Sequence, residues 1–161
     1  MSTTTAKDTL TMTLASDTEI VITREFDAPR ELVFKAMTDA EMIPKWWGPR
    51  MLRTVIETLE PRVGGKWRFL QYDPDGNEFA FNGIFKEFDP PSKLVMTLEF
   101  EPQAGHIITN ATTLENISGK TKMTVISTFA SKADRDGMLE QGMEWGMREG
   151  YERLDEVLAE Y

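Results

Sequence analysis

The C-terminal stretch of the chain, residues 133–160, reads ADRDGMLEQGMEWGMREGYERLDEVLAE. Its apolar residues recur at helical spacing, which predicts one long helix with a single broad apolar face. A continuous helix of this length would span about 40 Å at a rise of ~1.5 Å per residue. The apolar face comprises Leu139, Met143, Met147, Tyr151, Leu154, Val157, Leu158 and Tyr161.

The middle of the chain alternates apolar and polar residues with period two, which predicts strands. Turn sequences such as Asp73-Pro74-Asp75-Gly76 separate these strands. The connections are too short for helical crossovers, so the strands should be antiparallel. The six predicted strands cover residues 53–60, 66–72, 79–88, 94–100, 107–114 and 122–129.

The N-terminal part adds a strand region and two short helices. Residues 9–26 alternate in two pieces around Ser16-Asp17, which indicates a strand pair or one bent strand. Asp27 followed by Pro29 is typical of a helix start. Thr38 and Glu41 have capping-box spacing, which predicts a second short helix. The order of elements predicts an α+β domain in which one helix lies across one curved sheet.

Charge and composition exclude several classes of protein. The chain has 18 Lys and Arg against 27 Asp and Glu, a net charge of −9, so we expect no nucleic-acid and no membrane partner. It has no Cys, which excludes disulfides, thiolate metal sites and Cys nucleophiles. With only one His as well, we expect no metal site and no cofactor.

The length of 161 residues predicts one domain. We expect residues 1–8, which are small and polar, to be a flexible tail, and residues 9–161 to form the domain. No apolar run is long enough to span a membrane, and the N-terminus lacks the basic and apolar regions of a secretory signal. These features predict a cytoplasmic protein.

Several short motifs, taken together, resemble one protein family. They are ITREFDAP at residues 22–29, VFKAMTD at 33–39, WWGP at 46–49, VGGKW at 63–67, GIFKE at 83–87, PSKLV at 91–95 and GMREGYERL at 146–154. Their order and spacing, over residues 18–160, resemble the homologues of the activator of the heat-shock-protein-90 ATPase. This family belongs to the START-like, or SRPBCC, superfamily.

The resemblance implies a helix-grip fold. In that fold a seven-stranded antiparallel sheet curls around a long C-terminal helix, and two short helices follow the first strand. The superfamily uses the space between helix and sheet as an apolar ligand cavity. The eukaryotic co-chaperone also has a separate N-terminal domain that contacts the chaperone. Only a short segment precedes the domain in this sequence, so we do not expect a chaperone partner.

Aromatic and methionine side chains are the candidate ligand-binding residues. Alternation places those of each strand on one face, and the helix would supply the rest. The candidates are Trp47, Trp67, Phe69, Phe81, Met96, Leu98, Met143, Met147 and Tyr151. Their role would be apolar contact, with one hydrogen bond from Trp67 or Tyr151. Such faces fit a filled core as well as a hollow one that holds an apolar or aromatic molecule.

Three glycines and three tryptophans need a structural reason. Gly142, Gly146 and Gly150 recur every four residues in the predicted helix, which suggests close packing against the sheet or room for a ligand. Trp145 lies on the opposite side of the helix from Met143, which suggests a partner surface, such as a homodimer, or packing against a loop. Trp46-Trp47 would plug the core or gate the cavity.

No catalytic constellation is recognisable, so we favour a binding protein over an enzyme. His106, in a predicted loop, should be an exposed surface residue. The polar residues on strands, most of which we expect to be exposed, are Glu57, Arg68, Gln71, Asn82, Glu99, Asn110 and Thr112. Two alternative functions stay open: a cyclase, dehydratase or hydrolase that uses the same cavity, and a co-chaperone or stress-response interaction module.

Overall fold

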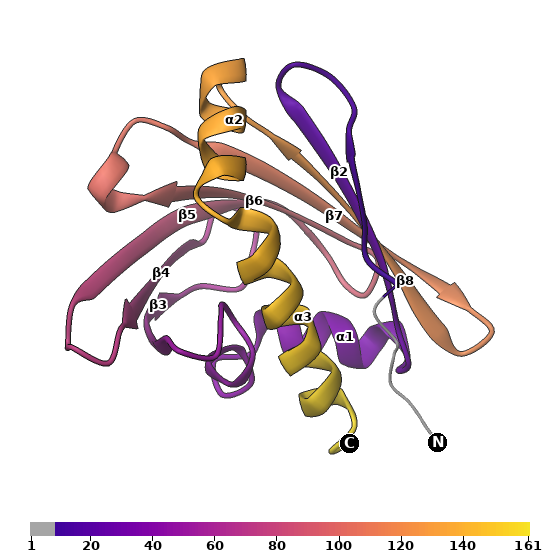
Figure 1. Cartoon of the computed structure of the whole chain (residues 1–161). Coiled ribbons are helices and arrows are strands. Elements are labelled where there is room, and N and C mark those ends of the chain that lie inside the picture. The colour runs from indigo at the N-terminus through magenta and orange to yellow at the C-terminus, as the bar shows by residue number, and fades with distance from the viewer. Residues whose placement is uncertain (1–8) are drawn as a thin grey trace.

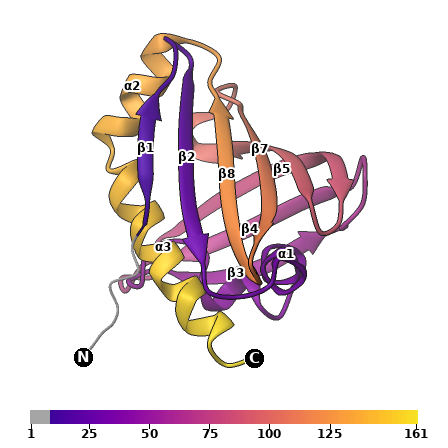
Figure 2. The same cartoon turned by 90° about the vertical axis from the view of Figure 1, so that its right-hand side faces the viewer.

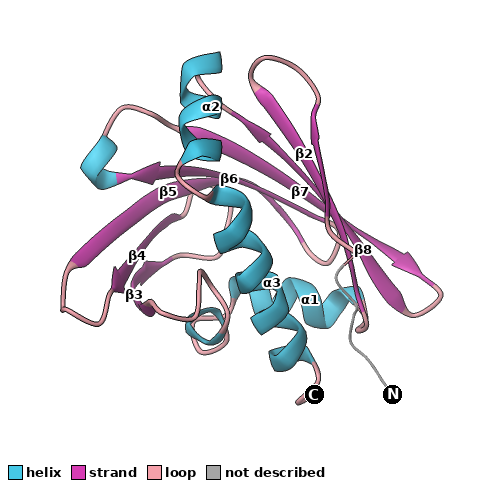
Figure 3. Ribbon diagram, viewed as in Figure 1, coloured by secondary structure: helices cyan, strands magenta, loops and turns pink. Residues whose placement is uncertain are grey.

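The computed structural model describes residues 9–161, and the tail predicted for residues 1–8 lies outside them. One sheet and a small set of helices make up this part of the chain (Figure 1 and Figure 3). The strands are β1 (Thr11–Leu14), β2 (Glu19–Phe26), β3 (Arg53–Leu59), β4 (Lys66–Tyr72), β5 (Glu78–Asp89), β6 (Lys93–Phe100), β7 (Ile108–Ile117) and β8 (Lys120–Thr128). The helices are α1 (Arg30–Thr38), α2 (Lys132–Glu140), α3 (Met143–Leu158) and the 3₁₀ turns η1 (Ile43–Lys45) and η2 (Glu101–Gln103).

The sheet is antiparallel throughout and has the strand order β1-β2-β8-β7-β6-β5-β4-β3. Within residues 9–161 it contains eight strands, so the expected number of seven was wrong. The additional strand is β1, which pairs with β2 from Leu14 opposite Ile20 to Thr11 opposite Thr23. Residues 9–26 therefore form a strand pair, and α1 follows the second strand rather than the first.

The C-terminal helix is not continuous, which corrects the prediction of one long helix. Gly142 adopts a left-handed conformation with φ of 87° and separates α2 from α3. A residue with a β-carbon would be strained there, so glycine supplies the break. The Ser131 hydroxyl accepts a hydrogen bond from the amide of Asp134 and caps the start of α2.

The predicted helix caps near the N-terminus were also wrong. Pro29 is the residue that precedes α1, and Asp27 makes no capping hydrogen bond there. The Thr38 hydroxyl donates to the carbonyl oxygen of Phe34 at 2.9 Å and caps no helix. Asp39 instead accepts from the amide of Glu41 at 2.7 Å, and only the single turn η1 follows.

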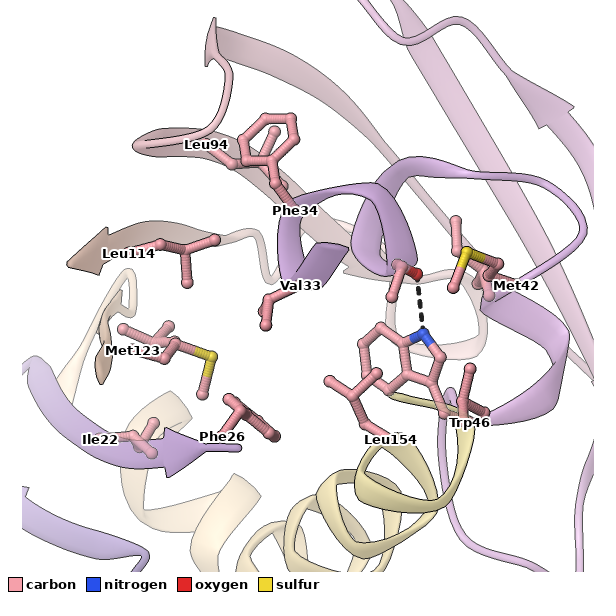
Figure 4. Packing of buried hydrophobic residues seen from close by; sticks show 14 of the residues in the cluster. Ile22, Phe26, Val33, Phe34, Met42, Trp46, Leu94, Leu114, Met123 and Leu154 are labelled. Atoms are coloured by element: carbon pink, nitrogen blue, oxygen red, sulfur yellow. Dashed lines mark hydrogen bonds between the residues drawn. The ribbon is translucent and has the colours of Figure 1, made fainter. Parts of the chain in front are cut away.

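Helices α2 and α3 cross one face of the curved sheet, as the two perpendicular views show (Figure 1 and Figure 2). The core lies between this concave face, α1 and the C-terminal half of α3 (Figure 4). Val33, Met123 and Leu154 are fully buried at its centre. Arg24, buried on β2, makes two hydrogen bonds of 2.8 and 2.7 Å with Asp155 and so ties α3 to the sheet.

Candidate functional site

A cavity of about 480 Å³ lies between the concave face of the sheet and the helices α2 and α3. Its floor is formed by alternate residues of the central strands. In β6, for example, Leu94, Met96, Leu98 and Phe100 all face it. Its roof is formed by α2 and by the first half of α3, and the segment Trp46–Pro49 closes one side. The wall is predominantly carbon, as expected for a small-molecule site.

Eight of the nine residues predicted to contact a ligand line this cavity. They come from three strands, the loop before β3 and α3, and the fold brings them together around one volume. The eight are Trp47, Phe69, Phe81, Met96, Leu98, Met143, Met147 and Tyr151. All except Phe69 are only partly buried, although they point to the interior of the domain. This partial burial is what a hollow interior produces.

Trp67 is the ninth predicted residue, and it does not line the cavity. Its ring lies behind Trp47 and Phe69, with ring centres 6.3 and 4.6 Å away, and it is 1% exposed. Its indole N–H donates to the carbonyl oxygen of Thr97 at 3.1 Å, so it has no hydrogen bond left for a ligand. Alternation placed Trp67 on the correct face of β4. The ring of Trp47 packs against it, and Trp47 rather than Trp67 borders the cavity.

The two adjacent tryptophans have different roles. Trp46 is buried, donates its indole N–H to the carbonyl oxygen of Ala36 at 2.8 Å (Figure 4), and stacks on Tyr151 with ring centres 6.3 Å apart. Trp46 is therefore a structural plug. Trp47 meets Phe69 and Phe81 edge-on, with ring centres 5.2 and 5.1 Å away, and forms an aromatic corner of the cavity.

The three regularly spaced glycines have three different structural reasons. Gly142 breaks the helix through its positive φ. A β-carbon on Gly150 would lie 3.3 Å from the carbonyl oxygen of Trp46, so this glycine allows close packing, but against the Trp46–Gly48 segment rather than the sheet. A β-carbon on Gly146 would meet only Pro49, at 3.9 Å, and Gly146 lines the cavity. Gly146 thus leaves open space in the roof.

Neutral polar groups interrupt the apolar wall. Gln71, 3% exposed, donates to the carbonyl oxygen of Trp47 and to the Thr54 hydroxyl, both at 3.3 Å. Across the pair β7 and β8, the Ser127 hydroxyl donates to the side-chain oxygen of Asn110 at 2.6 Å. Gln71, Asn110 and Ser127 all line the cavity.

The sequence contained a signal for these interior polar residues. Asn110 and Thr112 alternate in phase with Ile108 and Leu114, and Ser127 alternates in phase with Val125. Gln71, Asn110 and Thr112 therefore correct the expectation that most strand polar residues are exposed. Ser127 was missed, as were Met37, Met138 and Gln141, which also line the cavity.

Tyr151 is the one ionisable side chain in the wall formed by the described residues. Burial raises the pKa of Tyr151 to about 12, and the nearby Arg24 opposes this only in part. The phenol is therefore neutral at pH 7. Its hydroxyl makes no hydrogen bond to any residue between 9 and 161, so it is available to a bound molecule.

The charged strand residues gather outside the cavity. Arg68 makes two hydrogen bonds of 2.8 Å to Glu101 and a further ion pair to Glu57, while Asn82 donates to Glu101 at 2.9 Å. Glu99 accepts from the amide of Gly105. The hydrogen bonds from Arg68 and Asn82 lower the pKa of Glu101 to about 2. This network lies outside the cavity wall, on side chains that alternate with the cavity-lining ones.

His106 is exposed, as predicted, and its Nδ1 lies 2.9 Å from an Asp134 oxygen at the start of α2. Within the described residues, no group of three His, Cys, Asp or Glu side chains could hold a metal ion. Trp145 is 54% exposed and also borders the cavity, next to Gly146. Its expected role in a homodimer stays a prediction.

Proteins of known structure share this architecture. A protein from Rhodobacter sphaeroides matches with a TM-score of 0.88 at 24% identity, over 94% of this chain and 99% of that chain. A protein from Arthrobacter aurescens matches with a TM-score of 0.83 at 33% identity, over 92% of this chain and 94% of that one. The AHSA1 protein from Silicibacter pomeroyi matches with a TM-score of 0.73 at 20% identity, over 88% and 97%.

No curated protein matches the chain. Among residues 9–161, none of the helices has the length and hydropathy needed to cross a membrane. A family model, described as Activator of Hsp90 ATPase homolog 1-like protein, matches residues 27–159, which is most of the chain. The chain belongs to this family.

Proposed function

We propose that this domain binds a small apolar or aromatic molecule, without covalent chemistry, in the cavity between the sheet and helices α2 and α3. The observation that carries the proposal is the cavity itself, about 480 Å³ in volume and lined mainly by carbon. This volume lies within the ~300–1,000 Å³ range of small-molecule sites. The family and its START-like fold are in keeping with a ligand-binding domain.

The composition of the wall supports a binding role. Six methionines from five different elements line the cavity, namely Met37, Met96, Met123, Met138, Met143 and Met147. Because thioether side chains are flexible and polarisable, they adapt to ligands of varied shape. Trp47, Phe69 and Phe81 offer aromatic edges and faces at the other side. The ligand would lie between the adaptable and the rigid parts of the wall.

The two alternative functions have less support. An enzyme of the cyclase, dehydratase or hydrolase type would need an acid or base in the cavity, and Tyr151, held neutral, is the one ionisable group in the described wall. A co-chaperone role rests on the family description and on the exposed Trp145. Neither has an observation that favours it over simple binding.

A cavity-filling variant tests the proposal. Met96→Trp places a large ring in the cavity. Ile126→Trp places the same ring on β8 at a position that is 39% exposed and does not line the cavity. We expect native mass spectrometry of freshly purified protein to detect a bound small molecule in the wild type and in Ile126→Trp, and not in Met96→Trp.

The same three proteins are then titrated with naphthalene by equilibrium dialysis, which does not depend on a co-purified ligand. The proposal predicts saturable binding at one site that Met96→Trp abolishes. Absence of naphthalene binding to the wild type, or equal binding to both variants, would show that the cavity is not a ligand site.

A further inference from the structure

A polar pair lies in the floor of the cavity between apolar neighbours. Asn110 on β7 is directly opposite Ser127 on β8, and Met96 and Ile20 flank the pair in the same row across the sheet. Asn110 and Ser127 both line the cavity, and Ser127 is only 3% exposed. Buried polar groups in such a wall are expected to have hydrogen-bond partners.

Only the oxygen of the Asn110 amide has a hydrogen bond from a side chain of the described residues. The Ser127 hydroxyl donates to Oδ1 of Asn110 at 2.6 Å, which orients the amide. The Nδ2 of Asn110 carries two N–H donors, and it donates to none of the residues from 9 to 161. Thr112, the next residue on the same face of β7, is 9% exposed and also lines the cavity. Both side chains can therefore donate to a group inside the cavity.

The wall offers no charge to a ligand. None of the described residues that line the cavity is Asp, Glu, Lys, Arg or His. The arginines packed nearby are already engaged: Arg24 by Asp155, and Arg153 by the carbonyl oxygens of Gly48 and Pro49. A buried charge without a partner is far more unfavourable than a buried carbonyl or hydroxyl. The chain is also strongly acidic overall, which further disfavours an anion.

We infer that the ligand is an uncharged compound with a hydrogen-bond acceptor, such as a carbonyl oxygen, on an apolar or aromatic frame, and that Asn110 donates to this acceptor. The inference rests on the proposed function, because it assumes that the cavity is occupied by a ligand. The apolar part of the compound contacts the aromatic corner formed by Trp47, Phe69 and Phe81.

Three probes of one ring system separate these contributions. Naphthalene has no polar group, 2-acetylnaphthalene adds a carbonyl acceptor, and 2-naphthoate is an anion at pH 7. Equilibrium dialysis measures the dissociation constant of each with the full chain. We expect 2-acetylnaphthalene to bind, and 2-naphthoate to bind at least about tenfold more weakly than 2-acetylnaphthalene because no cation compensates its charge.

The double variant Asn110→Leu/Ser127→Ala removes both members of the pair, so that no buried hydroxyl is left without its partner. It should weaken 2-acetylnaphthalene binding by about 3- to 10-fold, the value of one hydrogen bond, and leave naphthalene binding unchanged or stronger. Thr109→Val, a polar-to-apolar change at the next residue along β7, where the side chain points to the other face, is the matched control and should change neither.

A second variant keeps the test valid if the double variant does not fold. Asn110→Asp has the same shape but accepts hydrogen bonds instead of donating them when ionised. It should also weaken 2-acetylnaphthalene more than naphthalene. If naphthalene does not bind the wild type at all, the proposed function fails. If naphthalene binds but 2-naphthoate binds most tightly, or the folded variants weaken both neutral probes equally or neither, the assignment to Asn110 is overturned while the cavity remains a ligand site.

Discussion

The ion pair between Arg24 and Asp155 gives a stability prediction that depends on its unequal burial. Arg24 is 1% exposed, its guanidinium carbon lies 4.8 Å from the centre of the Phe26 ring, and it makes two hydrogen bonds to Asp155. Asp155 is 34% exposed. Water can therefore solvate the carboxylate if the arginine is removed, but it cannot reach the guanidinium if the carboxylate is removed.

Asp155→Asn should lower the free energy of unfolding by about 3 kcal/mol. Breaking a fully buried pair by removing one partner costs about 3–5 kcal/mol, and the partial exposure of Asp155 places this pair at the lower end. Arg24→Met keeps the apolar stem of the side chain against Phe26 and should cost less, about 1–2 kcal/mol. Urea denaturation at pH 7 measures both.

Glu156→Gln, which breaks the exposed ion pair with Arg50, is the control and should change stability by less than about 0.5 kcal/mol. Two results would be incompatible with this prediction: an Asp155→Asn cost no larger than that of Glu156→Gln, or a larger loss of stability from Arg24→Met than from Asp155→Asn. Either result would mean that burial of the guanidinium does not set the energetics of this contact between α3 and the sheet.

Three further predictions concern local features of the fold. Gly142→Ala should destabilise the protein by about 1–2 kcal/mol, because the φ of Gly142 is 87°. Gly137→Ala, inside α2 with open space around it, should stabilise the protein by about 0.5–1 kcal/mol. The two variants should shift the thermal midpoint in opposite directions, and equal shifts would contradict this. Gly83→Ala places a β-carbon 1.9 Å from the carbonyl oxygen of Thr97 and 2.5 Å from Trp67 Nε1, so urea denaturation should show a loss of about 3 kcal/mol or more; a neutral effect would refute this packing. Because the folded-state pKa of Glu101 is about 2, below its ordinary value of 4.5, the stabilisation from Arg68 and Asn82 is present above about pH 4.5 and is lost as the pH falls towards 2. Glu101→Gln should therefore lower the thermal midpoint at pH 6 and converge with the wild type near pH 2, and parallel curves at all pH values would count against the network.

Much of the fold could be predicted because its signals are local. Alternation and turn chemistry gave the range of β4 as residues 66–72, and the structure has Lys66–Tyr72. The break in the C-terminal helix could not be predicted from periodicity. The apolar face continues in phase across Gly142, and one backbone dihedral of that residue decides between one helix and two.

The strand and helix faces that border the candidate site could be predicted, but the open space between them could not. Alternation identified Phe69, Met96 and Leu98 as interior residues. Whether Trp47 or Trp67 borders the open space depends on where the loop before β3 lies, which is set by contacts distant in sequence. The interior polar residues Asn110 and Ser127 had the correct phase, but hydrophobicity alone assigns such side chains to the solvent face.

The proposed function requires a hollow, apolar interior between the sheet and the helices. Diffraction from crystals of this protein under xenon pressure probes that interior, because xenon enters apolar cavities that side chains leave unfilled. We expect a xenon peak between Trp47, Met96 and Met147, which all line the cavity. A structure in which these three side chains fill the space and no xenon lies between them would contradict it.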